Sequence, residues 1–203
     1  MGNNGPRTEL TNAFTGMRKD NDVSGLRMLF PVLALIGTCS LAGCSASGLA
    51  AEDEPYLFDT SDPSFHLATP CEDITEERLE ELGLTHLDEG GEIYRKQGLE
   101  SCAFWTEDGA AIVVNAAAYK LARVAESRVP LPYEPSSEKQ PALAFSPEGN
   151  EACVIGAETQ RGTVEVNYSS SNSYEVEPVD ECPQAEKYFD LLIGEKLSEY
   201  RSH

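Results

Sequence analysis

The sequence contains few residues of the kinds that most enzymes and nucleic-acid-binding proteins use. Only 15 of the 203 residues are Lys or Arg, against 35 Asp or Glu, so the formal net charge is −20. Such a surface repels phosphates and anionic headgroups, and we expect neither nucleic-acid binding nor electrostatic docking on a membrane. Histidine occurs three times, at His66, His86 and His203. His66 lies in or near the expected tether and His203 at the end of the chain, so a catalytic arrangement would have to use His86, and we expect no enzyme, metal site or cofactor.

The sequence also lacks an apolar run long enough to span a bilayer. The longest run, Met28–Leu41, is too short and is followed by Ala42-Gly43-Cys44. Small residues before a cysteine at the end of a hydrophobic segment are typical of bacterial lipoprotein signals. We therefore predict a signal peptide over residues 1–43, with either Met1 or Met17 as the start, and a diacylglyceryl anchor on Cys44. A retained anchor helix is disfavoured by the processing site.

This anchor predicts that the protein lies on the outer face of the cytoplasmic membrane. Residues 1–43 contain four Lys or Arg and three Asp or Glu, which leaves 11 basic and 32 acidic residues in the mature chain. Its surface is too acidic to hold it on anionic lipid, so the acyl chains must provide the attachment. Residues 44–67 mix small, acidic and proline residues, and they predict a lipidated N-terminus and flexible tether of about 25 Å.

Four cysteines remain once Cys39 has left with the signal peptide and Cys44 carries lipid. They are Cys71, Cys102, Cys153 and Cys182. An even number of widely spaced cysteines in an oxidising compartment predicts two disulfides. Three pairings are possible, and we favour Cys71–Cys102 with Cys153–Cys182 because each joins chain neighbours across loops of similar size. A zinc site is disfavoured because no two of the four have Cys-x-x-Cys spacing.

The remaining residues, 68–203, are enough for one domain with a modest core. Helices are expected over 73–83, where Asp73 and Glu76 have capping-box spacing, and over 184–198, with Pro183 in the first turn. Residues 116–128 suit either a helix or a continued strand, and most of 129–149 should be a surface loop. Strands are expected at residues 101–105, 110–115, 142–145, 152–157 and 163–168. The fold class is therefore α+β, with an antiparallel sheet of about four to six strands, two or three helices and two disulfides.

The order of these segments resembles that of actinobacterial lipoproteins of the domain of unknown function 3558 family. The resemblance rests on the anchor sequence, on the four cysteine positions and on four short segments. These segments are ITEERLEELGL at 74–84, SCAFW at 101–105, EACVIG at 151–156 and ECPQAE at 181–186. It implies an envelope lipoprotein with disulfides, and it brings no catalytic residues.

Two aromatic residues are candidates for ligand contact. Trp105 is the only tryptophan, and we expect it to pack against a disulfide, with a place at the mouth of a ligand cleft as the alternative. Tyr133 lies in the proline-rich stretch and could line a pocket or cover the edge of the core. Our leading hypothesis is a non-enzymatic binding module for a small or lipidic envelope ligand. The alternative is a module that docks on a membrane or cell-wall enzyme and modulates it.

Overall fold

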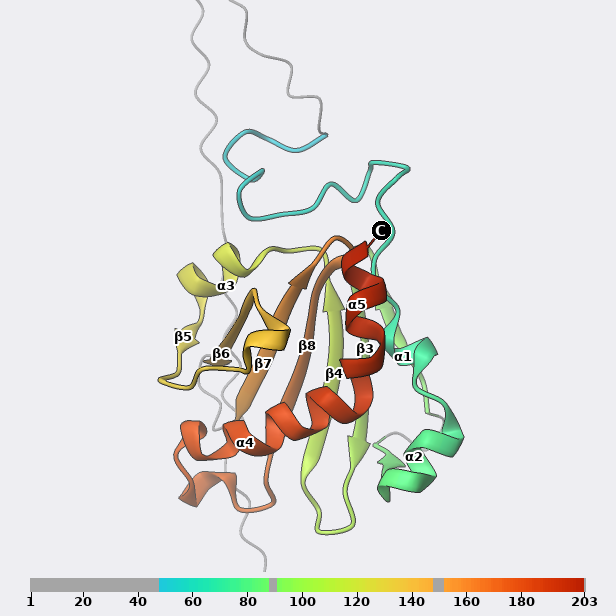
Figure 1. The fold of residues 1–203 in the computed structure, drawn as a ribbon, viewed down its shortest axis with the longest axis vertical. Helices are drawn as coiled ribbons and strands as arrows, with labels where there is room; N and C mark the ends of the chain where they lie inside the picture. Colours follow the sequence, from blue (N-terminus) through green and yellow to red (C-terminus); the bar gives the residue numbers. More distant parts are fainter. Residues whose placement is uncertain (1–47, 88–90, 148–151, 203) are drawn as a thin grey trace, which may run out of the picture. The chain divides into compact units, whose positions relative to one another are not determined.

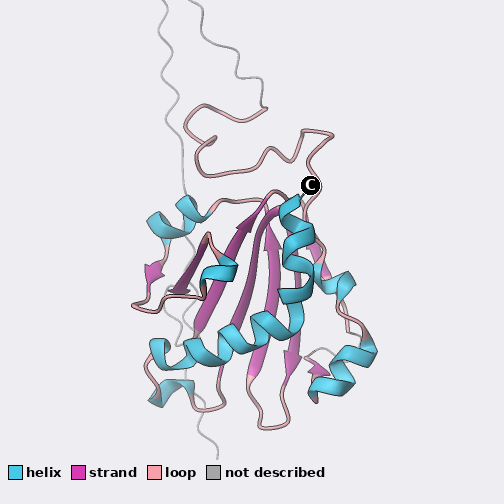
Figure 2. Cartoon of the chain, viewed as in Figure 1, coloured by secondary structure: helices cyan, strands magenta, loops and turns pink. Residues whose placement is uncertain are grey.

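The computed structural model describes residues 48–87, 91–147 and 152–202, and an antiparallel sheet forms its centre (Figures 1 and 2). Cys44 and the predicted signal peptide 1–43 lie outside the described residues. The strands are β1 (Thr85–His86), β2 (Tyr94–Lys96), β3 (Leu99–Trp105), β4 (Ala111–Ala117), β5 (Val129–Pro130), β6 (Ala142–Ser146), β7 (Cys153–Thr159) and β8 (Gly162–Ser169). Their order is β1-β3-β4-β8-β7-β6-β5, and β2 also pairs with β3.

The α+β class and the antiparallel sheet are confirmed, but the sheet has eight strands rather than four to six. The additional strands β1, β2 and β5 have only two or three residues each. Alternation of polar and apolar residues cannot be recognised over so short a length. The helices are α1 (Pro70–Asp73), α2 (Glu76–Leu82), α3 (Leu121–Ser127), α4 (Pro178–Phe189) and α5 (Glu195–Ser202), and a π-helical turn (Asp190–Gly194) joins α4 to α5.

The main core lies between the sheet and the helices α1, α4 and α5. Alternate residues of the central strands point into it, and α4 crosses β7 and β8 (Figure 1). Phe104, Ile112, Ile155, Val164 and Phe189 are almost completely buried there. Each such side chain contributes about 1.5–3 kcal/mol by leaving water, so this face is the main source of the domain's stability.

A smaller core lies on the opposite face of the sheet. Leu121 and Val124 of α3 pack there against Phe145 of β6 and Val154 of β7. Residues 116–128, which suited either a strand or a helix, contain both. Strand β4 continues through Ala117, and helix α3 follows at Leu121. Helix α3 covers only the β6–β7 side of this face.

Two predicted helix starts were wrong. The side chain of Thr75, not of Asp73, accepts the backbone N–H of Arg78 and caps α2. Helix α4 begins at Pro178, so Pro183 lies inside the helix rather than in its first turn. Pro178 and Pro183 would each suit the first turn of a helix, and in the structure Pro178 occupies it.

The favoured disulfide pairing is confirmed. Cys71 of α1 is bonded to Cys102 of β3, and Cys153 of β7 to Cys182 of α4, with Cα–Cα distances of 5.9 and 5.1 Å. Each bond therefore ties the N-terminal part of a helix to a strand of the sheet.

Residues 48–68, which we name the strap, lie against the end of the sheet instead of forming a free tether. Phe58 donates its backbone N–H to Ala118 at 3.0 Å, and Lys120 donates its N–H to Tyr56 at 2.8 Å. The predicted flexible tether 44–67 is therefore wrong for its described part. Composition alone could not reveal this, because a few backbone hydrogen bonds and not an apolar pattern hold the segment.

The far end of the strap is fixed by Arg161, in the turn between β7 and β8. Its guanidinium donates to the carbonyls of His66 and Leu67 at 3.2 and 3.1 Å. Its own carbonyl accepts the N–H of Ala68 at 2.8 Å. The strap is thus attached to the same end of the sheet at two places, at residues 54–58 and at residues 66–68.

Candidate docking face

Exposed apolar side chains gather on the face of β3 that α3 leaves uncovered. We name this surface the β3 face and define it by Leu87, Tyr94, Ala103, Trp105 and Val113. Exposure reaches 39% at Leu87, 55% at Tyr94 and 41% at Trp105. Helix α1, which contacts β3 and β4, belongs to the main core on the other side of the sheet. Large apolar side chains that cluster in the open are typical of interaction surfaces.

The strand register brings these side chains to one face. Residues directly opposite each other in antiparallel strands point to the same side, and Trp105 pairs with Ala111 and Ala103 with Val113. Tyr94 pairs with Ser101, two residues before Ala103. The backbone N–H of Leu87 donates to the carbonyl of Ala103, which places Leu87 at the outer edge of the face. The face therefore has contributions from four strands or strand ends.

The expected contact between Trp105 and a disulfide is wrong. Cys102 and Phe104 point into the main core, and Trp105 lies an odd number of residues from Cys102, so it points to the other side of β3. The alternative of an open, ligand-facing aromatic remains as a hypothesis. Leu87 and Tyr94 were not predicted, because the alternation that marks β3 is absent from the short strands that carry them.

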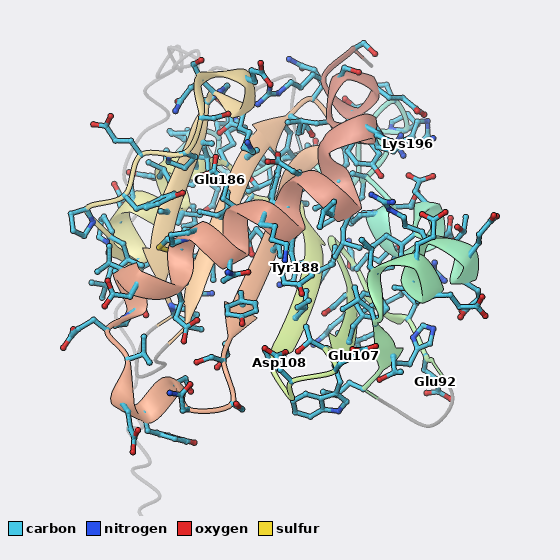
Figure 3. All side chains as sticks on the ribbon, turned by 60° about the horizontal axis from the view of Figure 1, so that its bottom comes forward. Glu92, Glu107, Asp108, Glu186, Tyr188 and Lys196 are labelled. Atoms are coloured by element: carbon cyan, nitrogen blue, oxygen red, sulfur yellow. A yellow bond between two sulfur atoms is a disulfide. The ribbon has the colours of Figure 1, made fainter. Side chains whose placement is uncertain are left out.

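The β3 face has acidic neighbours. Glu92 lies two residues before Tyr94, and Glu107 and Asp108 lie on the turn between β3 and β4 (Figure 3). The turn residues line a hollow with Gly83 and with Tyr188 of α4, on the side of the sheet that carries the helices. A bond from the Thr106 hydroxyl lowers the pKa of Asp108, so this carboxylate is negative at neutral pH. The large excess of Asp and Glu over Lys and Arg in the chain would favour a partner with basic residues around an apolar centre.

Tyr133 lies far from this face. It lines a cleft of about 460 Å³ beside β5 and β6, and β4, β8 and β7 separate these strands from β3. Its hydroxyl donates to Glu186, and burial together with this carboxylate raises the pKa of Tyr133 to about 12. The structure therefore does not bring the two predicted ligand residues, Trp105 and Tyr133, into one site.

An ion-pair network supports the cleft that contains Tyr133. Lys139 is only 7% exposed at its side chain, and its Nζ lies 3.1 Å from Glu186 Oε1 and 2.9 Å from Asp190 Oδ1. Burial opposes the charge on Lys139, but bonds to Asp190 and Glu186 outweigh it and raise the pKa of the amine. This network holds the β5–β6 connection against α4 and the π-helical turn.

The buried carboxyl of Glu165 in β8 is 5% exposed and lies on the side of the sheet that carries α3. Burial raises its pKa, while bonds from the Tyr119 hydroxyl and the Asn115 amide act in the opposite direction. Tyr119 is itself held neutral, because burial and Glu165 raise its pKa. Among the described residues, Tyr119 and Asn115 are the side chains that bond to Glu165.

His86 and the four cysteines of the domain each have a partner within the described residues. The Nε2 atom of His86 lies 2.9 Å from Glu76 Oε1, and the cysteines at 71, 102, 153 and 182 form disulfides. No group of three or more His, Cys, Asp or Glu in the described ranges could hold a metal ion. Within the same ranges, no helix is both long and apolar enough to cross a membrane.

These features define a disulfide-linked α+β domain with an open apolar sheet face. The chain belongs to the family described as "Protein of unknown function (DUF3558)", which matches residues 39–195. The matched span contains Cys44 and the four disulfide cysteines. No curated protein and no solved structure matches the chain.

Proposed function

We propose that the protein is a lipid-anchored module without catalytic activity that docks on a protein of the cell envelope. The anchor is the diacylglyceryl group expected on Cys44, and the protein then acts at the outer face of the cytoplasmic membrane. The observation that supports docking is the clustering of Leu87, Tyr94 and Trp105 on one open face of the sheet. Aromatic side chains of this kind supply much of the binding energy in protein interfaces.

The partner should carry a basic rim around an apolar centre. Two copies of this chain would bring together surfaces with a large excess of Asp and Glu, so self-association through the β3 face is disfavoured. The acidic surface of this chain would favour binding of a basic partner, because opposite electrostatic potentials speed the encounter of two proteins and fix their orientation. A membrane or cell-wall enzyme with such a rim would be bound and modulated.

The test is photo-cross-linking in living cells. A photoreactive amino acid placed at Tyr94 or Trp105 should give a discrete cross-linked product with one envelope protein. The matched control is Tyr174, which is 88% exposed but lies outside the β3 face. Equal products from Tyr174, or no product from the β3 face, would contradict the proposal. Raised salt should weaken the cross-link, because the rim charges are exposed.

A small envelope ligand is a second candidate function, and it is favoured by the cleft around Tyr133. Apolar residues form much of its wall, including Pro130, Leu131 and Leu143. Native mass spectrometry of the mature protein should then show extra mass that is lost on denaturation and reduced in Tyr133→Ala. A clean protein mass would contradict this function.

A further inference from the structure

The strap and the Trp105 end of the β3 face lie at different ends of the same strands. The strap bonds to Ala118, directly after the end of β4, whereas Trp105 pairs with Ala111 at the start of β4. Seven residues of extended chain separate these points, which is roughly 20 Å at about 3.3 Å per residue. The Trp105 side of the β3 face is therefore remote from the point where the N-terminal chain joins the domain.

The strap also leaves little free chain before that point. The backbone N–H of Gly48 donates to the Asp59 carboxylate at 2.5 Å. Lys120 Nζ donates to the carbonyl of Glu54 at 2.6 Å, and the same amine lies 5.6 Å from the ring centroid of Phe58. Only residues 45–47 separate Cys44 from Gly48, where this bonded segment begins.

We infer that the strap holds the domain upright on its lipid anchor, so that the Trp105 end of the β3 face points away from the bilayer. This inference rests on the proposed function, because it takes Cys44 as the anchor and the β3 face as the docking surface. It also narrows the class of partner. The basic site that docks here must belong to an extracytoplasmic domain that stands off the membrane, not to a segment embedded in it.

The alternative, a free tether, would allow the opposite geometry. A flexible chain has a root-mean-square span of about 5–6 Å times the square root of its residue number. Three residues then span about 10 Å, but the 23 residues from 45 to 67 span about 26 Å. With the longer tether the domain could tip over and bring Trp105 to the lipid surface.

Trp105 is the only tryptophan, so its own fluorescence can report this distance. The lipidated full-length protein is reconstituted in vesicles that contain a dansyl-labelled headgroup lipid, and energy transfer from Trp105 is measured. The wild type should show weak transfer. A Lys120→Ala/Arg161→Ala variant removes the side-chain bonds to Glu54, His66 and Leu67 and so weakens both attachments of the strap. Its energy transfer should rise at least about twofold as the tether lengthens.

The matched control is Lys96→Ala. Lys96 pairs with Leu99 at the same end of the sheet as the strap, and it forms no ion pair within the described residues. Its transfer should equal that of the wild type. Thermal unfolding of both variants shows whether the domain is still folded, and hydrogen exchange of peptides from 54–68 measures strap docking directly. This exchange should be slow in the wild type and fast in the double variant.

Two results would overturn the inference. One is rapid exchange of 54–68 in the wild type, and the other is strong energy transfer in the wild type that the double variant does not change. Neither result would affect photo-cross-linking at the β3 face. Absence of cross-links together with weak transfer would instead contradict the docking function and leave the orientation intact.

Discussion

The buried carboxyl of Glu165 should make stability fall as pH rises from acid toward neutral. Glu165 is 5% exposed, and burial raises its pKa above the ordinary value of 4.5. The folded protein therefore holds this proton more tightly than the unfolded chain. Its contribution to the free energy of unfolding is complete below pH 4.5 and is lost progressively up to the folded pKa. The loss is about 1.4 kcal/mol per pH unit within that window.

Glu165→Gln isolates this effect, because an amide has no proton to lose and can still accept the Tyr119 hydroxyl. Near pH 4.5 or below, variant and wild type should have similar stability. As pH rises, the free energy of unfolding of the variant should increase relative to that of the wild type by about 1.4 kcal/mol per pH unit. This increase should end at the pH where Glu165 ionises in the folded wild type. In a domain of this size, each kcal/mol shifts the melting temperature by about 2–4 °C.

The assay is thermal unfolding of both proteins from about pH 4 to about pH 8 with the disulfides oxidised. The difference between the two curves is the relevant quantity, because it cancels all other titrating groups. Glu186→Gln is a control of opposite sign. Burial raises the pKa of Glu186, but bonds from Tyr133, Ser136 and Lys139 outweigh it and lower the pKa. Glu186→Gln should therefore be less stable than the wild type at neutral pH, and this difference should shrink as the pH falls into the acid range. Parallel curves for Glu165→Gln and wild type would refute the reasoning.

Three further predictions concern the parts of the structure that hold the sheet and its connections. Gly162→Ala should lower the free energy of unfolding by about 2 kcal/mol or more, because φ is +95° and an added Cβ would lie 2.5 Å from the carbonyl oxygen of Ala117. Lys139→Met should cost about 1–3 kcal/mol, because it removes the ion pair of the largely buried Glu186, which keeps only its bonds from Tyr133 and Ser136, while the exposed Asp190 loses little. Replacement of Cys153 and Cys182 by alanine should cost roughly 3–4 kcal/mol, since the bond closes a loop with a sequence separation of 29. Urea unfolding at neutral pH measures all three.

Each of these predictions has a result that would contradict it. Gly109→Ala is the matched control for Gly162→Ala: its φ is +81°, but the nearest atom to an added Cβ is 3.8 Å away, so it should cost less. An equal cost at both glycines would show that backbone strain alone matters. An unchanged midpoint for Lys139→Met would mean that the ion pairs add no net stability. An unchanged midpoint for the double cysteine variant would show that the bond does not constrain the unfolded chain.

The sequence predicted best where a pattern extended over several residues. The expected strands at 101–105, 110–115 and 163–168 located β3, β4 and β8. The disulfide pairing followed from chain spacing alone. These signals are local, so neighbouring residues carry them without knowledge of the fold.

The remaining features depend on contacts between distant residues. Strands β1, β2 and β5 exist because longer neighbours pair with them, and the strap is held by bonds to Tyr119 and Arg161. The sequence singled out Trp105 but placed it on the wrong side of β3. Trp105 is three residues after Cys102, and residues an odd number of positions apart in a strand point to opposite faces, so Trp105 and Cys102 cannot share a face. Leu87 and Tyr94 join Trp105 only through the register, which no single segment specifies.

The bond between Cys71 and Cys102 has a mechanical consequence. If Cys44 is anchored in the bilayer, a force that pulls the domain away from the membrane enters through the strap. The strap would peel from the sheet one hydrogen bond at a time, and unravelling would stop at Cys71, which is covalently joined to β3. About 27 residues are released by then, or roughly 90 Å of chain at about 3.4 Å per residue. Under a pulling force the protein could therefore extend by this length while the sheet and its β3 face stay folded.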